Sequence, residues 1–141
     1  MTAQDRGPLF VYGSLLFPEI LSAVLGRVPD SSQGTVNGWR AAALPGRTYP
    51  GLVPSHGSAA AGRLLTRLSR DEWQLLDAFE EDAYDLRRLT LADGRRGWAY
   101  VWVDEQQVSP DDWSPEQFAA RHLSAFAEIC AAWRSDAICR P

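Results

Sequence analysis

The residues Tyr12–Leu15, with the sequence Tyr-Gly-Ser-Leu, have the types and spacing of an anion-binding or oxyanion-stabilising turn. They follow the apolar run Leu9–Tyr12 and precede a segment typical of a helix start at Pro18. At such a turn glycine lets the backbone approach a ligand, and successive N–H groups present partial positive charge. An ordinary strand-to-helix turn, with Gly13 present only for its dihedral angles, explains the same pattern. The dinucleotide-binding and P-loop motifs, G-x-G-x-x-G and G-K-[ST], are absent.

A second candidate is the acidic cluster at the end of a predicted helix, which comprises Asp77, Glu80, Glu81 and Asp82. Carboxylates oppose the helix dipole there, because a helix C-terminus favours cations. Glu80 directly follows Phe79, the last residue of an apolar stripe, so we expect the Glu80 carboxylate to lie against an apolar wall. Loss of water would raise its pKa and make it a usable general base. The alternative is a solvated acidic helix end.

The two histidines and a set of alternating aromatic residues are weaker candidates. His122 lies on the apolar stripe of the last predicted helix, which favours a packed histidine over a catalytic base. His56 lies in a Ser/Gly-rich loop, where we expect exposure to solvent. Trp98, Tyr100 and Trp102 alternate along a predicted strand, and core packing explains them better than stacking on a nucleobase.

The composition excludes several classes of chemistry. The chain has 141 residues, and its 14 basic residues are all Arg, so a Schiff-base lysine and a P-loop lysine are excluded. Only two His and two Cys are present, and only His122 and Cys130 are close in sequence, which argues against a metal site. The formal net charge of −4 and the scattered arginines argue against a nucleic-acid partner.

The sequence also indicates where the protein works. Cys130 and Cys139 lack C-x-x-C spacing, so we interpret them as free thiols in a reducing compartment. There is no apolar run long enough for a membrane span, and residues 1–7 lack the apolar core of a signal peptide. We therefore expect a cytoplasmic protein with no membrane partner.

Periodicity and turn residues predict the secondary-structure elements that position these candidates. The predicted order of the elements is β-α-β-β-α-β-β-α. Ser69 and Glu72 have capping-box spacing, Asp93-Gly94 is a favoured hairpin turn, and residues 98–103 are apolar on both strand faces. Because strands cluster more than they alternate with helices, the order favours an α+β fold. The expected elements are strands at 9–12, 34–44 and 59–68, helices at 17–26, 69–81 and 114–134, a hairpin at 86–103, and an extended, non-central segment at 49–54.

Two motifs taken together resemble a known family. Leu9–Leu15 and Leu76–Glu80 are similar to the gamma-glutamylcyclotransferase-like family, and more so to its branch named for plant avirulence-induced genes, which includes gamma-glutamylamine cyclotransferases. Tyr49–Val53 and Tyr100–Trp102 resemble that branch too, and the similarity runs over residues 8–103. The resemblance implies a single domain over residues 1–141. Its compact mixed β-barrel would be surrounded by helices, with the C-terminal helix, residues 115–134, docked on it.

The resemblance also implies a function and its residues. In this family the Tyr12–Leu15 loop would bind the glutamyl end of a small γ-glutamyl substrate, and Glu80 would be the general acid/base. Glu80 would take a proton from the α-ammonium group, whose nitrogen would close the 5-oxoproline ring, and would return it to the leaving amine. No metal, cofactor or covalent nucleophile is implied. Further pocket residues implied by the resemblance are Arg47, Tyr49, Tyr84 and Tyr100.

One departure from the family pattern leaves the substrate open. Family members commonly have Tyr-x-Arg after the glutamate, whereas this chain has Leu86 at the Arg position, followed by Arg87 and Arg88. Either Arg87 takes the role after a local shift or the contact is missing. Because every basic residue of the chain is Arg, this departure leaves Arg87, Arg88 or Arg47 to meet any substrate carboxylate. Glu81 would point away from Glu80 on a helix, so Glu80 alone is the predicted base.

The identity of the leaving amine and the oligomeric state stay open. Alternatives are a non-catalytic protein that binds a small molecule in the same pocket, and a protein-interaction domain that uses the loop at residues 104–112.

Overall fold

The computed structural model describes residues 6–80 and 84–139, and its elements confirm the predicted α+β class. One five-stranded sheet has the order β2-β3-β1-β5-β4. Strand β1 pairs antiparallel with β3 and parallel with β5, so it lies in the middle of the sheet. The elements are β1 (Leu9–Val11), α1 (Pro18–Leu25), β2 (Ser31–Ala43), β3 (Pro50–Leu65), α2 (Arg70–Glu80), β4 (Tyr84–Thr90), β5 (Arg96–Trp102), α3 (Pro115–Arg121) and α4 (Leu123–Cys139).

The sheet curls strongly but does not close into a strict barrel. Within the described residues, its two edge strands, β2 and β4, share no strand ladder. Their ends meet at the β4–β5 turn, where the Ala92 N–H donates to the Thr35 carbonyl at 2.7 Å and Arg95 Nη2 donates to the Gln33 carbonyl at 2.6 Å. The curled sheet encloses an apolar cluster that includes Phe10, Val36 and Leu64. The fold is therefore an open, barrel-like sheet whose concave side is filled.

The segment predicted to be extended and non-central at residues 49–54 is extended from Pro50 and, among the described residues, has a strand partner on one side only. It differs from the prediction in that it continues into the strand predicted separately at residues 59–68. Residues 50–65 form the single strand β3, in which Pro50–Pro54 and the later residues pair with β2 on either side of a bulge. The β1 ladder reaches only Arg63–Leu65. Pro50 and Pro54 thus lie in the part of β3 that pairs only with β2. Their missing N–H groups are tolerated there, because the other side of the strand has no ladder in the described part of the chain.

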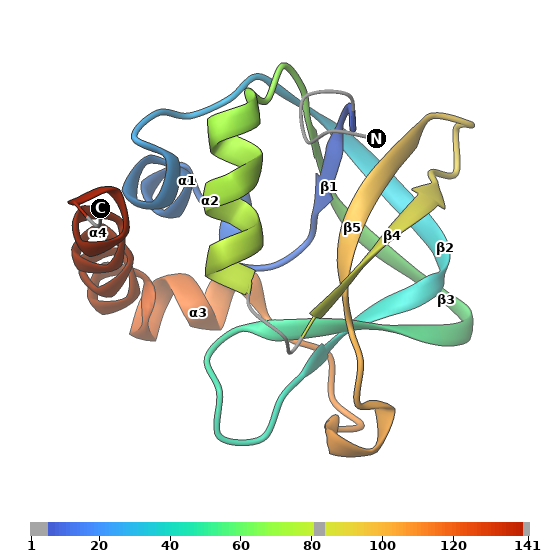
Figure 1. The fold of residues 1–141 in the computed structure, drawn as a ribbon. Coiled ribbons are helices and arrows are strands. Elements are labelled where there is room, and N and C mark those ends of the chain that lie inside the picture. Colours follow the sequence, from blue (N-terminus) through green and yellow to red (C-terminus); the bar gives the residue numbers. More distant parts are fainter. Residues whose placement is uncertain (1–5, 81–83, 140–141) are drawn as a thin grey trace.

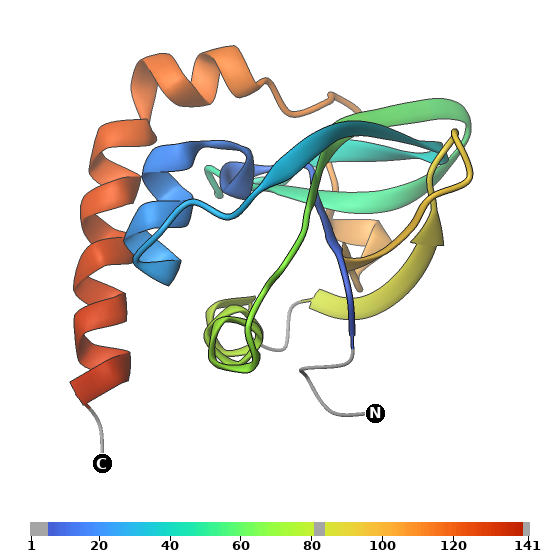
Figure 2. The ribbon, with the colours of Figure 1, turned by 90° about the horizontal axis from the view of Figure 1, so that it is seen from above.

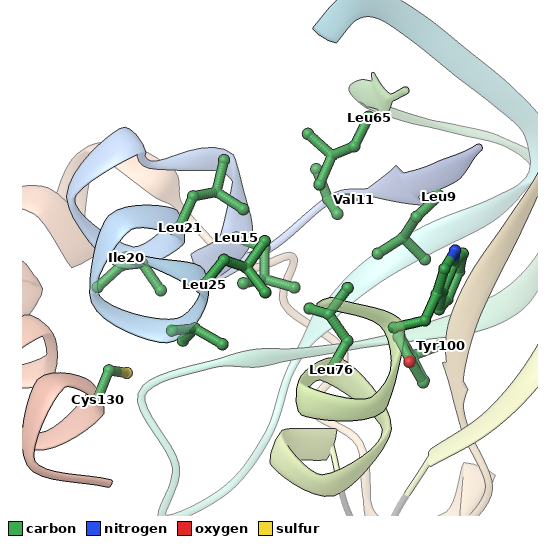
Figure 3. Packing of buried hydrophobic residues seen from close by; sticks show 12 residues of the cluster. Leu9, Val11, Leu15, Ile20, Leu21, Leu25, Leu65, Leu76, Tyr100 and Cys130 are labelled. Atoms are coloured by element: carbon green, nitrogen blue, oxygen red, sulfur yellow. The ribbon is translucent and has the colours of Figure 1, made fainter. Parts of the chain in front are cut away.

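The helices lie to one side of the curled sheet, and α4 runs beside α1 (Figures 1 and 2). The predicted C-terminal helix is divided at His122 into α3 and α4, and α4 packs mainly on α1 rather than on the sheet. A second apolar cluster joins these helices to the middle of the sheet. In Figure 3, Leu76 of α2 lies beside Tyr100 of β5, and Cys130 of α4 points toward Ile20 of α1.

The start of α2 matches the predicted capping box. The Glu72 N–H donates to Ser69 Oγ at 3.1 Å, and the Ser69 N–H donates to Glu72 Oε1 at 2.8 Å. The buried Glu72 carboxylate also accepts two hydrogen bonds from Arg27, at 2.6 and 2.7 Å. Burial alone would raise the pKa of Glu72, but its bonds to Arg27 and Ser69 outweigh burial and hold the pKa below its ordinary value. This network ties α2, which carries Glu80, to the end of α1.

We expect Glu72→Ala to lower the free energy of unfolding by about 2 kcal/mol near neutral pH, because it removes a cap and leaves Arg27 without its carboxylate. Since the folded-state pKa of Glu72 is depressed, this contribution is present at neutral pH and is lost as the pH falls through that pKa. Denaturant unfolding of the variant beside Asp71→Ala, an exposed acid of the same helical turn, measures it. Equal losses in the two variants would contradict the assignment.

Candidate active site

One cavity of about 260 Å³ lies where the loop after β1, the start of β3, the end of α2, and α4 meet. Its wall is aromatic and apolar over most of its extent, with a few polar groups. The lining residues are Phe10–Leu15, Tyr49, Pro50, Phe79, Glu80, Tyr84, Tyr100, Phe126, Ile129, Cys130 and Trp133. The Tyr12–Leu15 turn and Glu80, the two candidates from opposite parts of the sequence, thus lie in the same cavity.

All four residues of the Tyr12–Leu15 turn line this cavity. Residues 14–16 form one turn of 3-10 helix directly after β1. Within the described part of the chain, the N–H groups of Gly13, Ser14 and Leu15 have no hydrogen-bond acceptor. A Cβ atom on Gly13 would lie 2.7 Å from Pro50 Cγ, so glycine is required by the close approach of β3. The turn can therefore bind an anion or a developing oxyanion through its backbone.

Tyr12 fixes this turn to the rest of the sheet. Its buried hydroxyl donates to the Tyr100 carbonyl at 2.6 Å and accepts from the Leu52 N–H at 3.3 Å. Burial, and to a smaller extent the Glu80 charge, hold the pKa of Tyr12 well above its ordinary value. Tyr12 is thus a protonated, positioned phenol that links β1 to β3 and β5.

Glu80 is the last residue of α2, and its half-buried side chain lies at the cavity wall. Loss of water raises the pKa of Glu80 to about 8. Its charge also acts on Tyr12, Tyr84 and Tyr100, which places the carboxylate near the cavity phenols. Among the described residues Glu80 has no hydrogen-bond or ion-pair partner, and it is the one carboxylate that lines the cavity. Glu81 and Asp82, the neighbouring acids of the predicted cluster, fall outside the described residues.

Three of the four further pocket residues also line the cavity: Tyr49, Tyr84 and Tyr100. The Tyr84 hydroxyl donates to the Pro50 carbonyl at 2.8 Å, and the Tyr100 hydroxyl donates to Asp77 Oδ1 at 2.6 Å. Asp77, the remaining acid of the predicted cluster, is thus engaged with Tyr100 and is also paired with Arg6. Burial raises the pKa values of both Tyr84 and Tyr100, so these phenols stay protonated at neutral pH.

The arginines considered at the sequence level lie elsewhere. The Arg47 guanidinium packs 5.1 Å from the Trp102 ring centroid, and its side chain is exposed rather than at the cavity wall. Arg87 Nε donates to Asp85 Oδ2 at 3.3 Å, and the Arg88 guanidinium lies 5.8 Å from the Trp98 ring centroid. Neither Arg87 nor Arg88 lines the cavity. No arginine is among the lining residues that the structure describes, although the charges of Arg47 and Arg6 reach the lining residues Tyr84 and Tyr100.

The histidines take no part in the cavity. His56 is exposed as expected, but it lies within β3 rather than in a loop. The prediction that His122 is a packed histidine is wrong. His122 is exposed at the junction of α3 and α4, where its ring is tilted against that of Phe118, with the ring centroids 6.3 Å apart.

Several lining residues were not among the sequence candidates. Phe126, Ile129, Cys130 and Trp133 all come from α4, and Phe79 precedes Glu80 on α2. Their apolar spacing predicts a buried helix face and does not by itself indicate a cavity wall. Burial raises the pKa of the Cys130 thiol to about 11, so it is not a ready nucleophile.

Two features are absent from the residues that the structure describes. No group of three or more His, Cys, Asp or Glu side chains is arranged to hold a metal ion. Within the same part of the chain, no helix has the length and apolar character needed to cross a membrane.

The fold and the cavity define a class of small α+β proteins in which a strand-to-helix turn and a carboxylate at a helix end share one pocket. The model of the family described as gamma-glutamyl cyclotransferase, AIG2-like, matches residues 9–116. The chain therefore belongs to the gamma-glutamyl cyclotransferase, AIG2-like family.

Relatives and solved structures agree with this assignment. AIG2-like protein A of Arabidopsis thaliana is 32% identical over 130 residues, which are 85% of this chain and 76% of the relative. The solution structure of an Arabidopsis thaliana protein superposes with a TM-score of 0.65, at 27% identity and 92% coverage of both chains. A structure described as gamma-glutamyl cyclotransferase has a TM-score of 0.58 at 14% identity, covers 89% and 86% of the two chains, and shows the shared fold.

Proposed function

We propose that this protein is a gamma-glutamylcyclotransferase that releases 5-oxoproline from a small γ-glutamyl compound, with Glu80 as general acid/base. One observation carries the proposal: Glu80, with a pKa raised to about 8, lines the same cavity as the unpaired N–H groups of Gly13–Leu15. Family membership supports the class of reaction. A carboxylate with a raised pKa and a turn with unpaired N–H groups in one cavity support the proposal, because this reaction needs a base and an oxyanion-stabilising group.

The proposed reaction is an intramolecular acyl transfer. Glu80 accepts a proton from the substrate α-ammonium, and the freed nitrogen lone pair attacks the γ-carbonyl carbon to form the ring C–N bond. The carbonyl oxygen becomes an oxyanion, for which N–H groups of Gly13–Leu15 are the proposed donors. The tetrahedral intermediate collapses as protonated Glu80 returns its proton to the leaving nitrogen, whose bond to carbon breaks with its electron pair. The ring nitrogen still carries one extra proton, which it loses to the regenerated Glu80 carboxylate and from there to solvent, leaving the neutral lactam. The nucleophile and electrophile belong to one molecule, so the enzyme supplies mainly orientation and proton transfer.

A panel of γ-glutamyl amines, dipeptides and glutathione, each incubated with the purified protein, tests the proposal. We expect 5-oxoproline and the free amine to appear together from at least one substrate class. Binding of these compounds without any turnover would instead favour a non-catalytic protein that uses the same pocket.

The pH dependence of kcat/KM provides a separate prediction. A general base must be deprotonated in the free enzyme, so we expect kcat/KM to rise as the pH increases and to bend at an apparent pKa near 8. The pKa of Cys130 is about 11 and those of the cavity tyrosines are raised, so these groups do not produce a bend in this range. Steady-state assays from about pH 6 to about pH 9 measure the bend. If kcat/KM instead bends near about pH 4, the ordinary range of a carboxyl pKa, the base is a solvated carboxylate and not Glu80.

A further inference from the structure

The part of the cavity wall supplied by α4 and the end of α2 is apolar and aromatic. We call Phe79, Phe126, Ile129 and Trp133 the α4 wall; all four line the cavity. The Phe79 and Trp133 rings meet edge-on with centroids 5.2 Å apart, so residues distant in sequence form a continuous surface. The family match ends at residue 116, before α4 begins at Leu123. Most of this wall thus lies outside the region that the family model covers.

Ile129 distinguishes the α4 wall from ordinary core packing. Its side chain is 64% exposed although it lines the cavity, whereas Cys130, the next residue, is 1% exposed. An apolar side chain left at a cavity wall in this way offers surface that a ligand can cover. Covering it, together with the neighbouring rings, removes apolar area from water and favours binding.

The charges around the cavity disfavour a carboxylate at this wall. The described lining residues include no cation, and Glu80 is the one carboxylate among them. Arg47 lies over Trp102, with its charge also reaching Tyr84, and Arg134 lies against Gly26 at the end of α1. Neither arginine lines the cavity. A leaving group that carried its own carboxylate would lose water without gaining an opposite charge, and Glu80 in its deprotonated, reactive form would repel it.

Proton return determines which part of the substrate meets this wall. In the proposed reaction Glu80 protonates the leaving nitrogen, which therefore lies within hydrogen-bond reach of Glu80. Glu80 lies near α4, because its charge contributes to the raised pKa of Cys130, and it lines the cavity together with Phe79. The substituent on the leaving nitrogen is then next to the α4 wall, while the glutamyl part meets Tyr12–Leu15.

We infer that the α4 wall is the leaving-group subsite, and that it selects γ-glutamyl derivatives of apolar, above all aromatic, monoamines over γ-glutamyl amino acids and peptides. This inference rests on the proposed function. It names the substrate class by the chemistry of the wall: an uncharged aromatic or branched apolar group without a carboxylate.

Three matched substrates test the inference. γ-Glutamylphenethylamine and γ-glutamylphenylalanine differ by one carboxylate, and γ-glutamylmethylamine lacks the ring. We expect kcat/KM for γ-glutamylphenethylamine to exceed that for each of the others by about tenfold or more. Equal values, or a preference for γ-glutamylphenylalanine, would overturn the subsite while leaving a cyclotransferase in place.

A charge substitution on α4 provides a second test of the inference. Ile129→Arg should raise kcat/KM for γ-glutamylphenylalanine relative to γ-glutamylphenethylamine by about tenfold, because it supplies the missing cation. Ile138→Arg is the matched control, since Ile138 is 54% exposed on the same helix and does not line the cavity. Both positions are exposed, so neither change disturbs the core. The same ratio in both variants would contradict the inference.

Binding of unreactive analogues separates this inference from the proposed function. N-Phenethylglutaramate and N-glutarylphenylalanine lack the α-amino group and cannot cyclise. If no γ-glutamyl compound is turned over but calorimetry shows tighter binding of N-phenethylglutaramate, the cyclotransferase assignment fails and the subsite stands. If the two analogues bind equally or neither binds, the subsite is wrong.

Discussion

Replacing Glu80 by Gln is expected to lower kcat for 5-oxoproline release by about 10³-fold, with substrate affinity changed much less. Gln keeps the size of the side chain but neither accepts the ammonium proton nor returns it, and a positioned general base contributes about 10²–10⁴ in rate. Glu80 is the one carboxylate among the described cavity residues, so the structure offers no second base of this kind. Single-turnover assays measure the chemical step, and calorimetry with N-phenethylglutaramate measures binding.

The folded stability of Glu80→Gln is the control for this result. The folded-state pKa of Glu80 is raised to about 8, so the wild-type protein loses stability as the pH rises from the ordinary carboxyl pKa to about 8. The variant does not lose stability in this way. We expect its free energy of unfolding to exceed that of the wild type by about 1–3 kcal/mol above about pH 8. A variant that is stable but inactive would show that the substitution removes the catalytic step and does not unfold the protein. Activity within about fivefold of the wild type would exclude Glu80 as the base.

Replacing Gly13 by Ala is expected to lower kcat/KM by about 10²-fold, which is the size of the loss when one oxyanion donor is misplaced. The new Cβ would lie 2.7 Å from Pro50 Cγ, so the turn or the start of β3 must move. Either movement displaces the N–H groups of Ser14 and Leu15, and it also affects Tyr84, whose hydroxyl donates to the Pro50 carbonyl. We expect a loss of stability of about 1–3 kcal/mol from the overpacking.

Ser14→Ala separates the backbone of this turn from its side chain. The change keeps the Ser14 N–H and removes only the hydroxyl, which has no hydrogen-bond partner among the described residues. If the turn acts through its N–H groups, Ser14→Ala keeps kcat/KM within about fivefold of the wild type. Equal losses in Gly13→Ala and Ser14→Ala would show that the hydroxyl, and not the backbone, carries the function.

Elements with local signals were predictable from the sequence. Ser69 and Glu72 identify the start of α2 because each satisfies the other's backbone N–H, which depends only on residues three apart. Asp93-Gly94 forms the β4–β5 turn, where Gly94 has a φ of 94°. Family motifs and local spacing also indicated Tyr12–Leu15 and Glu80, because a turn and a helix end are continuous pieces of chain.

Features that depend on which surfaces meet were not predictable in this way. Pro50 and Pro54 predict a non-central segment, but local signals do not show that it continues to Leu65 as one strand. Periodicity grouped Ile129 and Trp133 with the core, yet it does not show where a helix is divided or which helix covers another. The α4 wall exists because α4 packs beside α1 and leaves these residues at a cavity.

The positions of the arginines also depend on which surfaces meet in the fold. Arg47, Arg87 and Arg88 were reasonable partners for a substrate carboxylate on sequence order alone. In the fold, Arg47 and Arg88 lie over Trp102 and Trp98, and Arg87 pairs with Asp85. Leu86, at the position of the family arginine, packs against the apolar cluster on the helix side. The absence of a cation among the described cavity residues is thus a property of the packing, and it carries the substrate inference.

The balance of products from γ-glutamylphenethylamine tests the central claim most directly. Quantitative mass spectrometry of a complete reaction measures 5-oxoproline, glutamate and phenethylamine together. A cyclotransferase predicts one 5-oxoproline for each amine released and no glutamate above the level of a protein-free control, because the substrate's own nitrogen is the nucleophile. Release of glutamate in place of 5-oxoproline would show that water attacks, and the cyclotransferase account would then be wrong.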